Sequence, residues 1–270
     1  MSALSSTSAE PRPRPRVPDA ALPWLGVLGV LALVELVERA GLIPSRYFPT
    51  VTDMGSALVD QLGQSAYWTA IVNTLEGWAI GLAIAIAIAI PLGLALGFSE
   101  VLYHAFRPAI EFLRPIPSVA LIPLAILVYG TGLQSKVFLV AFASIWPLLI
   151  QTIYGARDLD PIALETARSF RIRRSDRILR VTLMGAVPYI ATGLRISSAT
   201  ALILAITAEL IIGSAGLGRE INIARQGGAV DIMYALIVTT GLVGWGLNSL
   251  FAAGERRVLH WHPSHREAIA

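Results

Sequence analysis

Three histidines near the carboxyl end of the chain are residues whose type and spacing could bind a metal ion. His260, His262 and His265 lie within six positions of one another. A structural zinc site usually needs four ligands held in a fixed geometry. The chain has no cysteine to complete such a set, and the surrounding tail is expected to be flexible. We therefore predict no metal site.

Patterns of catalytic or nucleotide-binding residues are also missing. A phosphate-binding loop needs a glycine-rich turn that ends in lysine followed by serine or threonine. The single lysine, Lys136, follows no such turn, and the glycine-rich stretch 213–218 has no lysine. We interpret that stretch as a flexible connection, and we find no HExxH or GxSxG pattern. The sequence predicts a chain that is not an enzyme and carries no cofactor, so that any ATP and Mg²⁺ would bind another polypeptide.

The composition is that of a membrane protein. Hydrophobic residues make up 55% of the 270 residues and charged residues 14%, with a mean hydropathy of +0.66. A soluble domain carries about 25% charged residues. The absence of cysteine excludes disulfides, iron–sulfur clusters and a cysteine nucleophile. The net charge of +3 comes from arginines between apolar stretches, so we predict the lipid bilayer, and no nucleic acid, as a partner.

Long apolar stretches predict an all-α polytopic membrane protein, because only helices or a closed barrel satisfy every backbone group in lipid. About 20 apolar residues cross a bilayer. The alternating Ala–Ile run at 82–90 could suggest a strand, but both residue types are apolar, which favours a helix. A cleaved signal peptide is the alternative for the first stretch; the long polar leader argues against it. About six spans are expected, at 21–40, 70–98, 106–129, 136–154, 188–212 and 232–253.

The distribution of basic residues predicts the orientation. If the amino terminus is cytoplasmic, the inside segments contain 15 of the 21 basic residues and the outside segments contain 5, Lys136 among these. Both termini are then cytoplasmic. The predicted organisation is a disordered tail at 1–20, a transmembrane domain at 21–253 and a second tail at 254–270.

The most informative polar segment is 155–185, between the fourth and fifth spans. Asp160 and Pro161 are a typical helix start, and a second short helix is expected to open at Ser175. The segment contains both apolar and charged residues, so it could dock in a groove of a partner protein. The alternative is an ordinary basic loop that obeys the positive-inside rule.

Polar residues within the fifth span are candidates for a solute path. Ser197, Thr200 and Thr207 recur at helical spacing, and Glu209 lies near the outer end. Intramembrane charges are costly and often functional. A hydrated carboxylate at the membrane edge, or plain helix packing by the hydroxyl groups, are the alternatives. For Arg195 we favour snorkelling or a structural ion pair over contact with an anionic solute.

Several motifs together resemble the permeases of ABC importers, most closely the nitrate, sulfonate and taurine group. The run Glu165-Thr166-Ala167-Arg168-Ser169-Phe170 and the following 180–190 resemble the EAA loop of that family. The resemblance extends in order over about 45–258. It also includes the stretches 113–117, 134–138, 192–196, 208–211 and 214–218.

The resemblance implies a type I importer permease in the bacterial inner membrane. It implies a homodimer with two ATPase subunits and an extracytoplasmic binding protein, and a small anion such as a sulfonate, taurine or nitrate as solute. An ion-coupled secondary carrier is the alternative, and a membrane-embedded enzyme is a third, weaker one. The residues implied in coupling to the ATPase are Leu164, Glu165, Thr166, Ala167, Arg168, Ser169, Phe170 and Arg171.

Three residues depart from the family pattern. The family usually has alanine at the position of Thr166, glycine at that of Arg171 and proline at that of Met184. A non-glycine residue in the left-handed conformation costs about 1–2 kcal/mol. We therefore expect the turn at Arg171 either to be shaped differently or to be helical.

Overall fold

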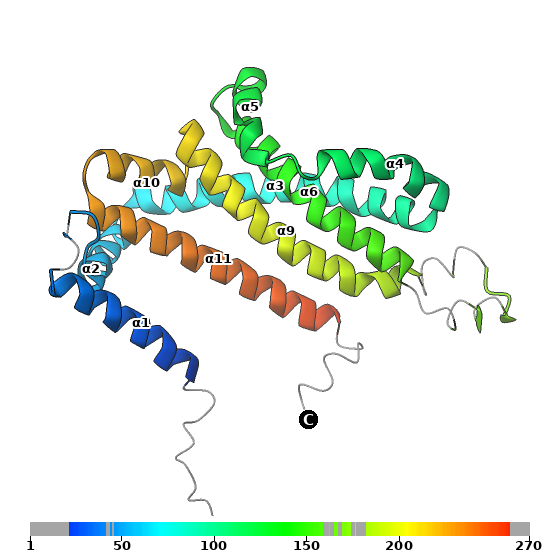
Figure 1. The fold of residues 1–270 in the computed structure, drawn as a ribbon, viewed down its shortest axis with the longest axis horizontal. Coiled ribbons are helices and arrows are strands. Elements are labelled where there is room, and N and C mark those ends of the chain that lie inside the picture. The colour runs from blue at the N-terminus through cyan, green and yellow to red at the C-terminus, as the bar shows by residue number, and fades with distance from the viewer. Residues whose placement is uncertain are drawn as a thin grey trace, which may run out of the picture.

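The computed structural model describes residues 22–41, 44, 46–158, 162, 165–166, 169–173, 176 and 182–259. Within these residues every regular element is a helix (Figure 1). The predicted tail at 1–20 and the three histidines lie outside them, as do the predicted helix starts at Asp160, Pro161 and Ser175 and the residues Leu164, Ala167 and Arg168. The principal elements are α1 (Leu22–Arg39), α2 (Val51–Leu62), α3 (Ser65–Phe98), α4 (Glu100–Leu113), η1 (Ser118–Leu121), α5 (Ile122–Tyr129), α6 (Leu133–Arg157), α9 (Leu183–Ile212), α10 (Leu217–Gln226) and α11 (Val230–Val258).

Four helices in the described part of the chain are long and apolar enough to cross a membrane, namely α3, α6, α9 and α11. They correspond to the predicted second, fourth, fifth and sixth spans. The predicted third span is broken at the prolines that follow Arg114, and its halves are bent by 79°. Counting that bent pair as one span gives five. The predicted first span, α1, has 18 residues and carries Glu35, Glu38 and Arg39 near its end. With three charged residues over the length needed to cross a membrane, it is not counted with the other four.

The long helices lie side by side, with α3, α6 and α9 forming the centre and α11 packing on α9 (Figure 1). One end of this bundle holds α2 and α10. At the other end α6 stops, α9 begins and α11 stops. Arg195, about three turns into α9, meets Glu255 near the end of α11. This second end borders the segment 155–185, which is predicted to couple to an ATPase. After that prediction we call the segment the coupling segment and this end the coupling end.

A stripe of small residues on α3 lets α6 approach closely. Its members recur every four residues and comprise Gly77, Gly81, Ala85, Ala89, Gly93 and Gly97. A Cβ atom built on Gly81 would lie 2.4 Å from Val140 Cγ1, and one on Gly97 would lie 2.4 Å from Ala156 Cβ. Small residues bring helices together in membranes, where dispersion contacts replace the hydrophobic effect as the driving force. The Ala–Ile run is helical, and its Ala85 and Ala89 fill part of this stripe, whereas Ala83 and Ala87 are exposed.

Replacing Gly81 with alanine should destabilise the folded protein by about 1–3 kcal/mol, because the added methyl group overpacks the contact with α6. Gly246 of α11 has no atom near its Cβ position, so Gly246→Ala is the matched control and should be neutral or slightly stabilising. Thermal unfolding in detergent measures the stability of both variants. Equal midpoints for the two variants would contradict the close packing of α3 on α6.

Candidate functional site

The coupling segment presents apolar side chains to the surroundings. Its described residues include Glu165, Thr166 and Ser169 in helical conformation, and the Phe170 amide donates to the Thr166 carbonyl at 3.0 Å. All of these are exposed, and the Phe170 side chain is 78% exposed. A large aromatic group left uncovered on a polar segment is typical of a surface that another protein covers.

Arg171 ends this helical piece in the left-handed conformation, with φ of 51°. It is the only residue other than glycine with positive φ in the described part of the chain. The turn therefore keeps a conformation that suits glycine, although the sequence places an arginine there. The expectation that the turn is differently shaped or helical is therefore wrong, and the departure from the family pattern leaves local strain at Arg171.

Replacing Arg171 with glycine should relieve this strain and slow hydrogen exchange in the peptide that covers 165–173 by about two- to five-fold, because the strain relieved is about 1–2 kcal/mol and part of it is offset by the larger chain entropy of glycine. Arg171→Ala is the control, since alanine retains the strain. Hydrogen-exchange mass spectrometry provides the comparison. A slower exchange in the alanine variant than in the glycine variant would contradict the strained turn.

Aromatic and charged side chains surround the coupling end of the bundle. Tyr189 of α9 donates a short hydrogen bond to Asp158, which follows α6. The Arg157 guanidinium lies 4.2 Å from the centre of the Tyr103 ring of α4. A hollow of about 420 Å³ opens between α4 and α6 beside these residues, and its lining includes Arg107. These contacts join α4, α6 and α9 where the coupling segment leaves the bundle.

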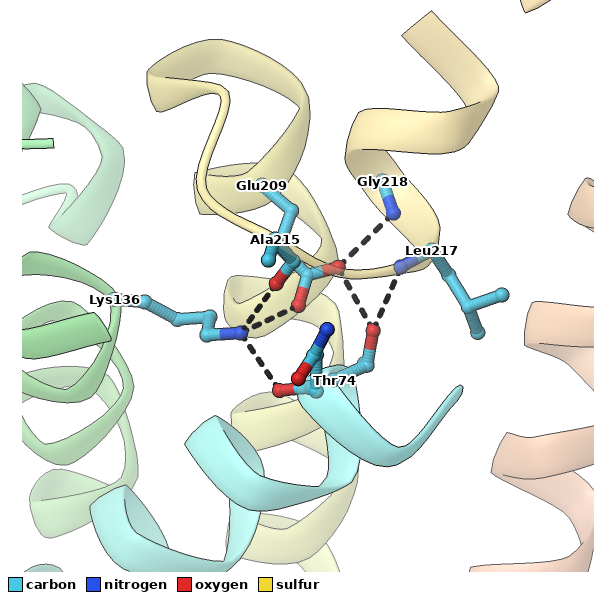
Figure 2. Close-up of polar contacts among 7 residues, drawn as sticks. Thr74, Lys136, Glu209, Ala215, Leu217 and Gly218 are labelled. Atoms are coloured by element: carbon cyan, nitrogen blue, oxygen red, sulfur yellow. Dashed lines mark hydrogen bonds and ion pairs between the residues drawn. The ribbon is translucent and has the colours of Figure 1, made fainter. Parts of the chain in front are cut away.

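The far end of the same helices contains a buried ion pair. Lys136 Nζ of α6 lies 2.9 Å from Glu209 Oε1 of α9 (Figure 2), and the two residues are 1% and 0% exposed. Nζ also donates to the backbone carbonyls of Asn73 at 2.8 Å and Ala215 at 2.9 Å. All three donors of the ammonium group are thus used, so the charge is compensated in a low-dielectric environment.

The second carboxylate oxygen of Glu209 holds the connection between α9 and α10. Glu209 Oε2 accepts from Thr74 Oγ1 and from the Gly218 amide, each at 2.9 Å. Thr74 Oγ1 in turn accepts from the Leu217 amide at 2.9 Å (Figure 2). Residues of the glycine-rich stretch are therefore packed and hydrogen-bonded, and the interpretation of 213–218 as a flexible connection is wrong.

Two glycines of this connection are required by the close approach of Glu209. Gly216 has φ of 150°, and a Cβ atom there would lie 2.1 Å from Glu209 Cδ. A Cβ atom on Gly218 would lie 2.3 Å from the Ile206 carbonyl oxygen. Only glycine fits at positions where the backbone approaches another group so closely.

The structure also places the polar residues predicted to line a solute path. Ser197 is buried, and its hydroxyl donates to the Ser144 carbonyl of α6 at 2.8 Å. Thr200 and Thr207 are partly exposed and donate to carbonyls of their own helix. Glu209 is buried in the ion pair rather than hydrated at an edge. Lining of a path by these residues stays a prediction.

Arg195 forms a structural ion pair, as predicted. Its guanidinium lies 3.3 Å from Glu255 of α11, with the arginine side chain 42% exposed. Because solvent screens such a pair, it contributes little to stability.

Sequence reasoning missed Lys136 and Thr74. Lys136 was assigned to an outside segment by the positive-inside count, whereas the structure buries it within α6. Its being the only lysine in a chain with 20 arginines was the signal available. Thr74 had no signal, because a threonine in an apolar helix is ordinary.

The fold matches solved transporters. A structure of the MetNI methionine ABC transporter in an inward facing conformation superposes with a TM-score of 0.61 at 18% identity. The match covers 72% of this chain and 96% of that one. A second match, to an amino acid ABC transporter, has a TM-score of 0.59. At such identities the likeness shows the fold, which is that of ABC importer permeases.

Curated relatives cover most of the chain. SsuC of Escherichia coli, whose name assigns it to the transport of aliphatic sulfonates, is 31% identical over 90% of this chain and 92% of its own length. The nitrate import permease protein NrtB of Leptolyngbya laminosa is 30% identical over 88% of this chain and 86% of its own length. The taurine transport system permease protein TauC of E. coli is 29% identical over 88% of this chain and 89% of its own length.

The family described as binding-protein-dependent transport system inner membrane component matches residues 85–260. That range contains the bent pair, the coupling segment, the buried ion pair and the last three of the four long helices. The predicted resemblance is confirmed. This chain belongs to that family, and it is a multi-pass permease subunit of an ABC importer in the inner membrane.

Proposed function

We propose that the coupling segment is the docking site of a separate ATPase subunit and that two copies of this chain work with two such subunits. The observation that carries the proposal is the exposed Phe170 on a segment that directly joins α6 to α9. Membership of a binding-protein-dependent family supports the ATPase and an extracytoplasmic binding protein as partners. ATP and Mg²⁺ would then bind the ATPase. The coupling end and both termini would face the cytoplasm, which requires α1 to cross the membrane as well.

The proposed solute is a small anion such as a sulfonate, taurine or nitrate. The named substrates of SsuC, NrtB and TauC support this class. Calorimetric binding of methanesulfonate, taurine and nitrate to the partner binding protein tests it, with a neutral alcohol of similar size as the control. Binding of the alcohol alone would contradict an anionic solute.

Co-purification tests the docking site. Replacing Glu165 with arginine should reduce the ATPase recovered with the tagged permease by at least ten-fold, because it reverses an exposed charge in the docking helix. Asp60 is an exposed carboxylate of α2 at the opposite end of the bundle, so Asp60→Arg is the matched control and should retain the ATPase. Transport that continues without ATP on an ion gradient would contradict the ATP-driven importer.

A further inference from the structure

The two helices that flank the coupling segment are connected at their opposite ends by the Lys136–Glu209 pair. Lys136 precedes the end of α6 by 21 residues, and Glu209 follows the start of α9 by 26 residues. At 1.5 Å per residue the pair therefore lies about 30 Å or more from the coupling segment along each helix. The pair and the coupling segment thus close the two ends of one helical hairpin.

Close contacts connect α6 and α9 along the whole length between those ends. Near the coupling end a Cβ atom on Gly155 would lie 2.7 Å from Tyr189 Cβ. In the middle Ser197 donates to the Ser144 carbonyl. Towards the far end Leu139 and Ala208 belong to one buried cluster. A hairpin packed in this way resists internal sliding, so displacement of one end moves the other.

The far end of the hairpin also holds the connection to α10. Lys136 donates to the Ala215 carbonyl, and Glu209 accepts from the Gly218 amide. Thr74 bridges Glu209 and the Leu217 amide. The bonds of Glu209 and Thr74 are buried, and that from Lys136 to Ala215 is partly buried. Leu217 and Gly218 are the first two residues of α10. The start of α10 is therefore attached to α6 and α9 through the ion pair as well as through the chain itself.

We propose that Lys136 and Glu209 are positioning residues that make the α6–α9 hairpin a rigid lever, which carries movement of the coupling segment to the connection 213–218 and α10. The part of this proposal that concerns transport rests on the proposed docking of an ATPase. The attachment of α10 stands on the contacts above. Loss of the pair should leave the ATPase docked, but movement of the coupling segment should no longer be carried to α10.

The test uses the complete permease with its ATPase and the double variant Lys136→Met/Glu209→Gln. Both replacements are close in shape and neutral, so no unpaired charge remains buried. Hydrogen exchange in the peptide that covers 213–226 should become at least ten-fold faster, while the peptides of α6 and α9 keep their rates. Transport per ATP hydrolysed, in proteoliposomes with the binding protein, should fall at least five-fold.

The control variant is Arg195→Gln/Glu255→Gln, which removes the ion pair between α9 and α11. It should leave the hydrogen-exchange rate of the peptide 213–226 and the transport per ATP hydrolysed within two-fold of their values in the unmodified protein. A role confined to stability would lower the unfolding temperature of the Lys136/Glu209 variant without changing its transport per ATP. Unchanged exchange in 213–226, or unchanged transport per ATP, overturns the proposal.

Thr74→Val provides a second variant that keeps the ion pair and removes the bridge to the Leu217 amide. It should accelerate exchange in 213–226 by about three-fold, and no acceleration counts against the attachment of α10. Failure of the proposed function is distinguishable, because the unmodified permease would then show no associated ATPase. The exchange measurement needs no ATPase and tests the attachment in either case.

Discussion

Replacing Phe170 with alanine is expected to weaken ATPase association about 30-fold or more, with transport falling in proportion. Buried aromatic anchors at protein interfaces contribute about 2 kcal/mol or more when truncated to alanine, and this side chain is 78% exposed in the isolated chain. In the proposed complex it would be covered. Surface plasmon resonance between the purified permease and its ATPase measures the affinity, and vesicle uptake measures transport.

Phe112→Ala is the matched control for this prediction, because Phe112 of α4 is also a largely exposed phenylalanine, 73% exposed, and lies outside the coupling segment. It should change the affinity by less than three-fold. The Phe170 variant should keep its unfolding temperature, since an exposed side chain contributes little to the fold. An unchanged ATPase affinity for Phe170→Ala would show that the docking surface lies elsewhere.

Removing one partner of the buried ion pair should have the largest effect on stability. Lys136→Met leaves the Glu209 carboxylate buried and without its cation, and Glu209→Gln leaves the ammonium group without its anion. Breaking a buried pair in this way costs about 3–5 kcal/mol. The double variant removes both charges together and should recover most of that loss, so the two changes are strongly non-additive. Chemical unfolding of the four proteins in detergent completes the double-mutant cycle.

The pair formed by Arg195 and Glu255 is the comparison for this cycle. Its arginine is 42% exposed, so single replacements there should cost about 1 kcal/mol or less. If the single variants of the two pairs lose similar stability, the Lys136–Glu209 pair is hydrated in solution and is not buried.

The four long helices were predictable from the sequence because their apolar runs exceed the length that a bilayer requires. Their ends differ by a few residues, as for α3, which begins at Ser65 rather than near Ala70. The prolines after Arg114 correctly marked a break, but the 79° bend depends on packing against α6 and α9 and has no local signal. The helix α10 was missed because flanking glycines suggested only a loop.

The coupling role of 155–185 stays a prediction. The family was recognisable because its motifs are local in sequence. The ion pair was not, because its partners are 73 residues apart and each has an ordinary alternative. A lysine at the start of a span is usually interfacial, and a glutamate near its end is usually hydrated. Only the fold brings Gly77 of α3 against the aliphatic part of the Lys136 side chain. The absence of a side chain at Gly77 leaves the space that the lysine occupies.

The four-residue repeat on α3 has a further consequence. The stripe of small residues does not by itself fix the register between α3 and α6. If α6 slid by one helical turn, its side chains would lie over small residues again. The Lys136 ammonium group sets the register, because a shift of one turn would take Nζ away from Glu209 and from the Asn73 and Ala215 carbonyls. A single polar residue fixes the register of coiled coils in the same way. The ion pair and its carbonyl contacts therefore oppose slippage of α6 along the axis of α3.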